Sequence, residues 1–319
     1  MNPTLSPAAV KTLPVLTHFA PQTPISEFVD WYNANYDSIQ QQLLETGAII
    51  FRGVDIDSLE KFENVFTQLS KNFLNYVDGN SPRTKLSSKV YTSTEYDKNF
   101  SITLHNELSY SATYPTKIFF CCVLPAASGG ETPIADCRKI FEKMNPDLID
   151  EIKRKKITYV RNLHGGQGFG PTWQHTFETE DKATVEKYCT ESKVEYTWKK
   201  DGGLKLSQTR DGVIQHPVTK EWVWFNQMDQ FHPSHMSPEI YETLMLIYNN
   251  NEEELPTYVK FGDNSKVTTD MIKEIRKTVD SLAVLTPWEK GDLLMADNIL
   301  VCHGRMPYKG DRKVLVSMA

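Results

Sequence analysis

The sequence lacks three features that would place it at once in a broad class. Its formal net charge is −6, with 35 Lys and Arg against 41 Asp and Glu, so it has no basic excess of the kind that nucleic-acid-binding surfaces carry. It has no apolar run near the roughly 20 residues that cross a bilayer. Residues 1–12 also lack the cationic and apolar segments of a secretory signal. We therefore expect no nucleic-acid partner, no membrane partner and a cytoplasmic location.

Cysteine is scarce as well, with five in 319 residues. An odd number cannot form a complete disulfide framework. Cys121, Cys122 and Cys302 lie in apolar runs, which predicts small buried side chains rather than crosslinks. The sequence is 39% hydrophobic and 11% aromatic, enough for a sizeable core. This composition indicates a globular protein of a reducing compartment.

The order of the predicted elements favours one elaborated domain. Residues 1–24 contain five prolines and are expected to form an extended lead-in. Helical periodicity at 25–45 and 56–71 alternates with apolar strand-like runs, among them 48–51 and 116–124. No internal repeat or linker divides residues 25–319. The pattern predicts an α+β arrangement or a mainly β core with helical insertions.

A possible metal site begins with His105 and Glu107, which flank Asn106. On an extended segment, side chains two residues apart point the same way. His303, far along the chain, is the best candidate for a third ligand. Two His and one carboxylate form the facial triad that holds non-haem Fe(II) and leaves positions open for oxygen and a co-substrate.

A 2-oxo acid could fill two of those open positions, and the distal carboxylate of 2-oxoglutarate would then need a cation. Arg suits this role because its planar fork pairs with carboxylates through two hydrogen bonds. Arg312 follows His303 across a turn that contains Gly310. If His303 ends one strand and Arg312 begins the next, both can face one cavity. Thr132 could add a hydroxyl donor.

Several segments together resemble the Fe(II)/2-oxoglutarate oxygenases related to taurine dioxygenase and clavaminate synthase. They are 47–53, 105–110, 115–121, 129–136, 297–298, 303–308 and Arg312. The resemblance covers about 45–319, with a diverged stretch at about 160–280. It implies a double-stranded β-helix, or jelly-roll, core. It also implies His105, Glu107 and His303 as iron ligands, with Arg312 and Thr132 on the distal carboxylate of 2-oxoglutarate.

The implied activity is that of a dioxygenase that uses Fe(II), 2-oxoglutarate and O2. Relatives that halogenate lack the ligand carboxylate, so Glu107 argues for oxygen chemistry. The resemblance favours hydroxylation of an unactivated C–H bond in specialised metabolism such as antibiotic biosynthesis. The expected substrate is a small amino acid or amino-acid-derived molecule, either free or presented by a carrier protein. Two alternatives stay open. One is desaturation, cyclisation or cleavage of a carbon–heteroatom bond, and the other is a jelly-roll protein that binds metal without turnover.

Residues around the substrate are less well defined by the sequence. Arg161 and Arg210 could each bind a substrate carboxylate. Arg305, also a candidate substrate residue, is a rival of Arg312 for the distal carboxylate of 2-oxoglutarate, but its place two residues after His303 favours a positioning role. Tyr110 could form a cavity wall, and Asn226 could face the substrate. His232 and His235 have a metal-like spacing, but the intervening Pro233 and the lack of a third ligand favour a structural role.

Overall fold

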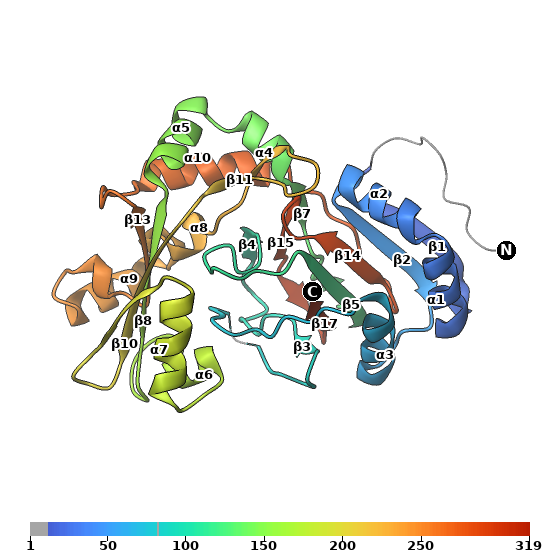
Figure 1. Ribbon diagram of the computed structural model, residues 1–319, viewed down its shortest axis with the longest axis horizontal. Helices are drawn as coiled ribbons and strands as arrows, with labels where there is room; N and C mark the ends of the chain where they lie inside the picture. Colours follow the sequence, from blue (N-terminus) through green and yellow to red (C-terminus); the bar gives the residue numbers. More distant parts are fainter. Residues whose placement is uncertain (1–11, 82) are drawn as a thin grey trace.

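The computed structural model describes residues 12–81 and 83–319. Its main element is a six-stranded sheet with the order β1-β2-β14-β5-β17-β3 (Figure 1). β1 lies parallel to β2, and the other neighbours are antiparallel. The strands are β1 (Val15–Thr23), β2 (Ala48–Val54), β14 (Leu293–Asp297), β5 (Lys117–Leu124), β17 (Lys313–Met318) and β3 (Tyr91–Thr92).

A smaller sheet lies beside the main one and carries the predicted metal ligands. Its order is β4-β15-β7, from β4 (Ile102–His105), β15 (Val301–Arg305) and β7 (Ile134–Asp136). β6 (Ser128–Gly129) and β16 (Tyr308–Lys309) form a separate short ladder. One apolar cluster joins both sheets and includes Ile50, Phe120, Ile134, Val301 and Val316. Two facing sheets around one core are the jelly-roll arrangement that the resemblance implied.

Three helices cover the outer face of the main sheet (Figure 1): α1 (Ile25–Ala34), α2 (Tyr36–Thr46) and α3 (Leu59–Leu69). They bury a second cluster with the sheet, which includes Phe28, Phe51, Phe62 and Phe119. The single helix expected at 25–45 is broken at Asn35, whose side chain donates to the Trp31 carbonyl over 2.8 Å. Such side-chain bonds to the backbone compete with helix continuation.

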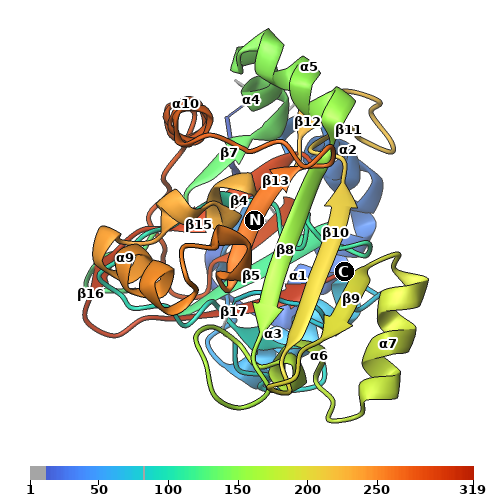
Figure 2. The same cartoon turned by 90° about the vertical axis from the view of Figure 1, so that its left-hand side faces the viewer.

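The stretch between β7 and β14 builds a third sheet, with the order β13-β8-β10-β9 (Figure 2). Its strands are β8 (Ile157–Leu163), β9 (Glu195–Trp198), β10 (Leu204–Arg210) and β13 (Thr257–Phe261). The hairpin of β11 (Val213–Gln215) and β12 (Trp222–Trp224) follows β10. The helices of this stretch are α4 (Cys137–Lys143), α5 (Pro146–Lys155), α6 (Trp173–Phe177), α7 (Lys182–Glu191), α8 (Met228–Phe231), η1 (Pro233–His235), α9 (Pro238–Ile247), η2 (Glu252–Glu254) and α10 (Thr269–Asp280).

The apolar cores bear on the expected domain organisation. The cluster between the sheets also contains Tyr159 and Val259 of the third sheet, which supports the proposal that 25–319 is one domain. Within the predicted extended lead-in, Val15–Thr23 forms an edge strand of the main sheet and pairs with β2 from Val15 and Ile49 onward. The part of the lead-in at residues 1–11 lies outside the described residues.

In the described part of the chain, no helix has the length and apolarity to cross a bilayer.

Candidate active site

The register of two strands brings the predicted histidines together. β15 and β4 run antiparallel, and His303 pairs with His105 across them. Their ring centroids lie 4.5 Å apart. The ligand atoms of these two side chains and of Glu107 all lie within 4.8 Å of one another, and all three residues are buried. This donor set fits a facial iron triad.

Glu107 reaches the site from a turn rather than from a strand. β4 ends at His105, and residues 107–110 form a turn in which Leu108 has a φ of 56°. The extended segment that the spacing argument assumed is therefore shorter than expected. Two buried amides fix the turn instead. Asn106 donates to the Asn298 carbonyl over 2.7 Å, and the Asn298 side chain accepts from the Glu107 amide over 2.8 Å.

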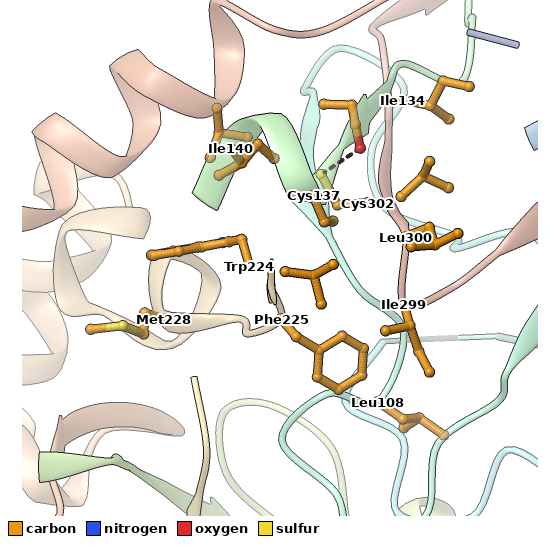
Figure 3. Packing of buried hydrophobic residues seen from close by; sticks show 14 of the residues in the cluster. Leu108, Ile134, Cys137, Ile140, Trp224, Phe225, Met228, Ile299, Leu300 and Cys302 are labelled. Carbon is orange, nitrogen blue, oxygen red and sulfur yellow. Dashed lines mark hydrogen bonds between the residues drawn. The ribbon is translucent and has the colours of Figure 1, made fainter. Parts of the chain in front are cut away.

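The residues next to these ligands anchor the site in the core. Leu108 follows Glu107, and Cys302 precedes His303. Figure 3 shows both gathered with Trp224 and Phe225 in one apolar cluster. Close packing of this kind resists displacement, so the ligand side chains are held by both the backbone and the core.

The environment of His105 prepares it to bind a metal. Its Nδ1 lies 2.8 Å from the Thr103 carbonyl, to which it must donate, so Nε2 is the nitrogen left for a metal. The side-chain amide of Gln230 lies 3.0 Å from the same Nδ1. Burial, followed by the nearby His303, lowers the pKa of His105 to about 3. The imidazole is therefore neutral at neutral pH, as a metal ligand must be.

Arg83 is a site residue that sequence reasoning missed. It forms a buried ion pair with Glu107 through Nη2. Burial opposes ionisation of Glu107, but the Arg83 charge and then the two imidazoles outweigh it, so the pKa of the carboxyl is lowered. Arg83 lies in a long polar loop, where no periodicity marks an inward-facing side chain. Only the fold brings it to the triad.

The predicted co-substrate residues share a cavity with the histidines. This site cavity holds about 20 Å³ and is lined by Arg83, Ser93, Thr94, Ile102, His105, Phe120, Thr132, His303, Gly304, Arg305 and Arg312. Small-molecule pockets usually hold several hundred Å³, so the surrounding side chains must move to admit 2-oxoglutarate.

Arg312 and Thr132 are suitably placed for a carboxylate. Arg312 directly precedes β17; its Nε donates to the Gly130 carbonyl over 2.9 Å and its Nη1 to Ser93 over 3.2 Å. Burial and the nearby Arg305 lower the pKa of Arg312 to about 10, so it stays charged at neutral pH. The Thr132 hydroxyl accepts from the Trp288 indole over 3.2 Å and keeps its own proton to donate.

Arg305 lies in the cavity wall, but its guanidinium holds a loop. Nη1 donates to the carbonyls of Thr94 and Tyr96, and Nη2 donates to those of Asp97 and Phe100, over 2.7–3.2 Å. These bonds leave only Nε without a partner among the described residues. The contacts favour the positioning role of Arg305 over direct binding of a carboxylate, whether of 2-oxoglutarate or of the substrate.

Three of the other predicted substrate residues are buried or half-buried and have partners away from the site cavity. Arg161 forms a buried ion pair with Asp78, whose backbone carbonyl also accepts from the Tyr110 hydroxyl over 2.9 Å. Arg210 donates to the Ser192 carbonyl over 2.9 Å. None of the three lines the site cavity.

Asn226 and the second histidine pair also have other roles. The Asn226 amide donates to the Gly212 carbonyl over 2.8 Å and its oxygen accepts from the Met228 amide, so it stabilises the turn after β12. His232 lies 3.2 Å from the Val267 carbonyl. Among the described residues, only His105, Glu107 and His303 form a cluster that could hold a metal.

Comparisons with known proteins agree with this geometry. Residues 11–318 match the model of the family described as Taurine catabolism dioxygenase TauD, TfdA family. The dapdiamide synthesis protein DdaC of Enterobacter agglomerans is 34% identical over 284 residues, which are 89% of this chain and 85% of that protein. A clavaminate synthase-like protein of Arabidopsis thaliana is 28% identical over 284 residues, 86% of this chain and 82% of that protein.

Solved structures share the fold at low sequence identity. AAD-2, in complex with Mn(II) and N-oxalylglycine, has a TM-score of 0.53 at 13% identity, with 96% of this chain and 93% of that chain covered. PvcB from Pseudomonas aeruginosa has a TM-score of 0.52 at 12% identity, with 95% and 84% covered.

Family, fold and donor set thus agree, and they set aside the alternative of a jelly-roll protein without turnover. The chain belongs to the taurine catabolism dioxygenase TauD, TfdA family and is an Fe(II)- and 2-oxoglutarate-dependent dioxygenase with a jelly-roll core.

Proposed function

We propose that this dioxygenase hydroxylates an unactivated C–H bond of an amino acid or an amino-acid-derived small molecule in specialised metabolism. The observation that carries the oxygen chemistry is Glu107, whose carboxylate lies with His105 and His303 in one buried cluster. The relative DdaC is named for dapdiamide synthesis, and the plant relative is called clavaminate synthase-like, which supports the substrate class.

In this proposal His105, Glu107 and His303 hold the iron, while Arg312 and Thr132 hold the distal carboxylate of 2-oxoglutarate. Bound iron, with oxygen and 2-oxoglutarate, supplies the oxidising power that removes hydrogen from the substrate. The chain supplies two imidazoles, of which that of His105 is neutral, and an ionised carboxylate, all three buried. The Thr103 carbonyl orients His105 from behind, and the Gln230 amide donates to the same carbonyl over 3.2 Å. The five cysteines are all unpaired, which supports the proposal of a cytoplasmic location.

An anaerobic titration tests the site before any substrate is known. Metal-free protein receives Fe(II) and then 2-oxoglutarate, and the weak visible charge-transfer band of the chelate is followed. The band should appear in the native protein, and Arg312→Gln should need about 10- to 100-fold more 2-oxoglutarate to form it. Substrate screening by succinate release, followed by product mass, then tests hydroxylation. A product heavier by one oxygen atom supports it, whereas loss of hydrogen or of a fragment would replace hydroxylation with desaturation, cyclisation or cleavage.

A further inference from the structure

Arg83 is a buried cation whose hydrogen bonds are incomplete. Only 2% of its side chain is exposed, and Nη2 donates to Glu107. Neither Nε nor Nη1 has a hydrogen-bond partner among the described residues. The guanidinium lies on the ring of Tyr76, with Cζ 4.7 Å from the ring centroid. Buried donors without acceptors cost free energy, so this arrangement indicates an acceptor that comes from outside the chain.

The charges of the loaded site indicate an anion, a step that rests on the proposed function. A divalent iron balances the two carboxylates of 2-oxoglutarate, and the charge of Glu107 balances that of Arg312. Arg83, which shares Glu107 with the iron, adds one further positive charge inside the protein. The other permanently charged groups that act on Arg312 are Arg305 and Glu131, which have opposite signs. The loaded site, in which Arg83 and the iron share Glu107, thus keeps one net positive charge, and a net charge in a buried site favours the arrival of a counter-ion.

Arg83 also lies where a substrate could meet the iron. It lines the site cavity, and it lines a second, outer cavity of about 400 Å³. The outer cavity is bounded by Tyr76, Gly79, Ser81, Arg83, Thr84, Lys85, Tyr91, Gln174, His175, Thr176 and Glu178. Its volume is in the range that small-molecule ligands occupy. Lys85 pairs with Glu178 over 2.7 Å, whereas the partner of Arg83, Glu107, is shared with the proposed iron.

We infer that Arg83 binds a carboxylate of the substrate at the border of the two cavities, while the rest of the substrate occupies the outer cavity. The free Nε–H and Nη1–H groups supply charge-assisted hydrogen bonds to the acid. The substrate class is therefore a small carboxylic acid. An aminoacyl group joined to a carrier through its only carboxyl would lack this group, so the inference favours a free acid over a tethered one.

Acetate and its neutral counterpart acetamide probe the site without turnover. The protein is loaded with Zn(II), which is redox-inert, and with N-oxalylglycine in place of 2-oxoglutarate. Binding of each probe is then measured by saturation-transfer NMR. The native protein should bind acetate at least about tenfold more tightly than acetamide, the ratio that a charge-assisted hydrogen bond provides. Arg83→Gln should lose this preference, and Arg83→Lys should keep part of it.

Arg154→Gln is the matched control, because Arg154 is exposed on α5, and it should leave the preference unchanged. Equal binding of acetate and acetamide by the native protein would overturn the inference. So would an acetate preference that survives Arg83→Gln, since it would then come from the metal. If Arg83→Gln fails to load N-oxalylglycine, the acetate affinity of Arg83→Lys tests the inference instead. An acetate affinity equal to that of the native protein contradicts the role of the guanidinium, and a severalfold loss supports it.

The result is separable from the proposed function. If N-oxalylglycine and Zn(II) bind but the protein does not prefer acetate to acetamide, the co-substrate site is supported and the role of Arg83 is contradicted. If acetate binds through Arg83 while the Fe(II)–2-oxoglutarate band never forms, the proposed iron and co-substrate residues are contradicted and the anion site is supported.

Discussion

His303 and His105 are cross-strand neighbours, paired where β15 meets β4, with ring centroids 4.5 Å apart. Two protonated imidazoles at this separation would repel each other. Their burial, with an ionised Glu107 beside them, instead creates a site that attracts a divalent cation. The short sheet therefore places two of the three donor atoms, and the register of β4 and β15 decides whether the two histidines meet.

The first prediction concerns His303. His303→Ala should lower the affinity for Zn(II) or Fe(II) by at least about a hundredfold, because loss of even an outer partner of a metal ligand costs up to that factor. Isothermal titration of the metal-free protein measures it. His18→Ala, an exposed change on β1, should leave the affinity unchanged. Unchanged metal affinity in His303→Ala, with a native circular dichroism spectrum, would remove His303 from the triad.

The sequence predicted the parts of this site that local pattern and resemblance could reach. The jelly-roll core, the pairing of His105 with His303 and the shared cavity of Arg312 and Thr132 follow from ordered motifs. Arg83 lies in a polar loop, where neither periodicity nor a motif identifies a side chain that points inward. Its role depends on how that loop folds back on the triad.

The substrate residues were harder to predict for a related reason. Arg161 was expected to bind a substrate, but Asp78, more than eighty positions earlier, already neutralises it. A charged residue in a strand signals that it needs a partner and does not identify that partner. Arg305 likewise meets four backbone carbonyls, which carry no signal in the sequence.

Arg312 provides the second prediction. Arg312→Gln removes the cation proposed to bind 2-oxoglutarate, so the KM for 2-oxoglutarate should rise by about 10- to 100-fold. Thr132→Val removes one neutral donor and should raise it less. Steady-state succinate formation at varied 2-oxoglutarate measures both, with Arg154→Gln as the control. An unchanged KM in Arg312→Gln would indicate that another cation of the cavity binds the distal carboxylate of 2-oxoglutarate.

The third prediction separates positioning from binding at Arg305. Arg305→Gln deletes the donors that hold residues 94–100. Hydrogen exchange of this segment should therefore accelerate, with a loss of about 2 kcal/mol or more in local stability. Exchange measured by mass spectrometry on the metal-free protein tests this without turnover. If the segment keeps its native protection, those four bonds do not order the loop.

The fourth prediction concerns the buried pair of Asp78 and Arg161. Each side chain is 1% exposed, and the Tyr188 hydroxyl donates to the same carboxylate over 3.0 Å. Asp78→Asn leaves the Arg161 charge unpaired and should lower the free energy of unfolding by about 3–5 kcal/mol. Arg161→Met alone should also destabilise, and the double variant should recover part of the loss. Additive losses in urea unfolding would show that the pair is not coupled.

The fifth prediction is a pH dependence of the metal-free protein. The pKa of His105 is about 3 in the folded state, against an ordinary value of 6.5. Between these values the unfolded chain binds more protons than the folded one, so stability rises with pH. The contribution of His105 to the free energy of unfolding is complete above about pH 6.5, and it is lost as the pH falls towards 3.

Comparison of the native protein with His105→Asn isolates this contribution. Between pH 6.5 and about 5, most carboxyls stay ionised, and His232, whose pKa is also lowered by burial, contributes equally to both proteins. The difference in unfolding free energy between the two should therefore shrink as the pH falls, by up to about 1.4 kcal/mol per pH unit. Urea unfolding with a chelator present measures it. A difference that stays constant across this range would mean that His105 takes up a proton in the folded protein as readily as in the unfolded chain, and its imidazole would then be poorly prepared for a metal at mildly acidic pH.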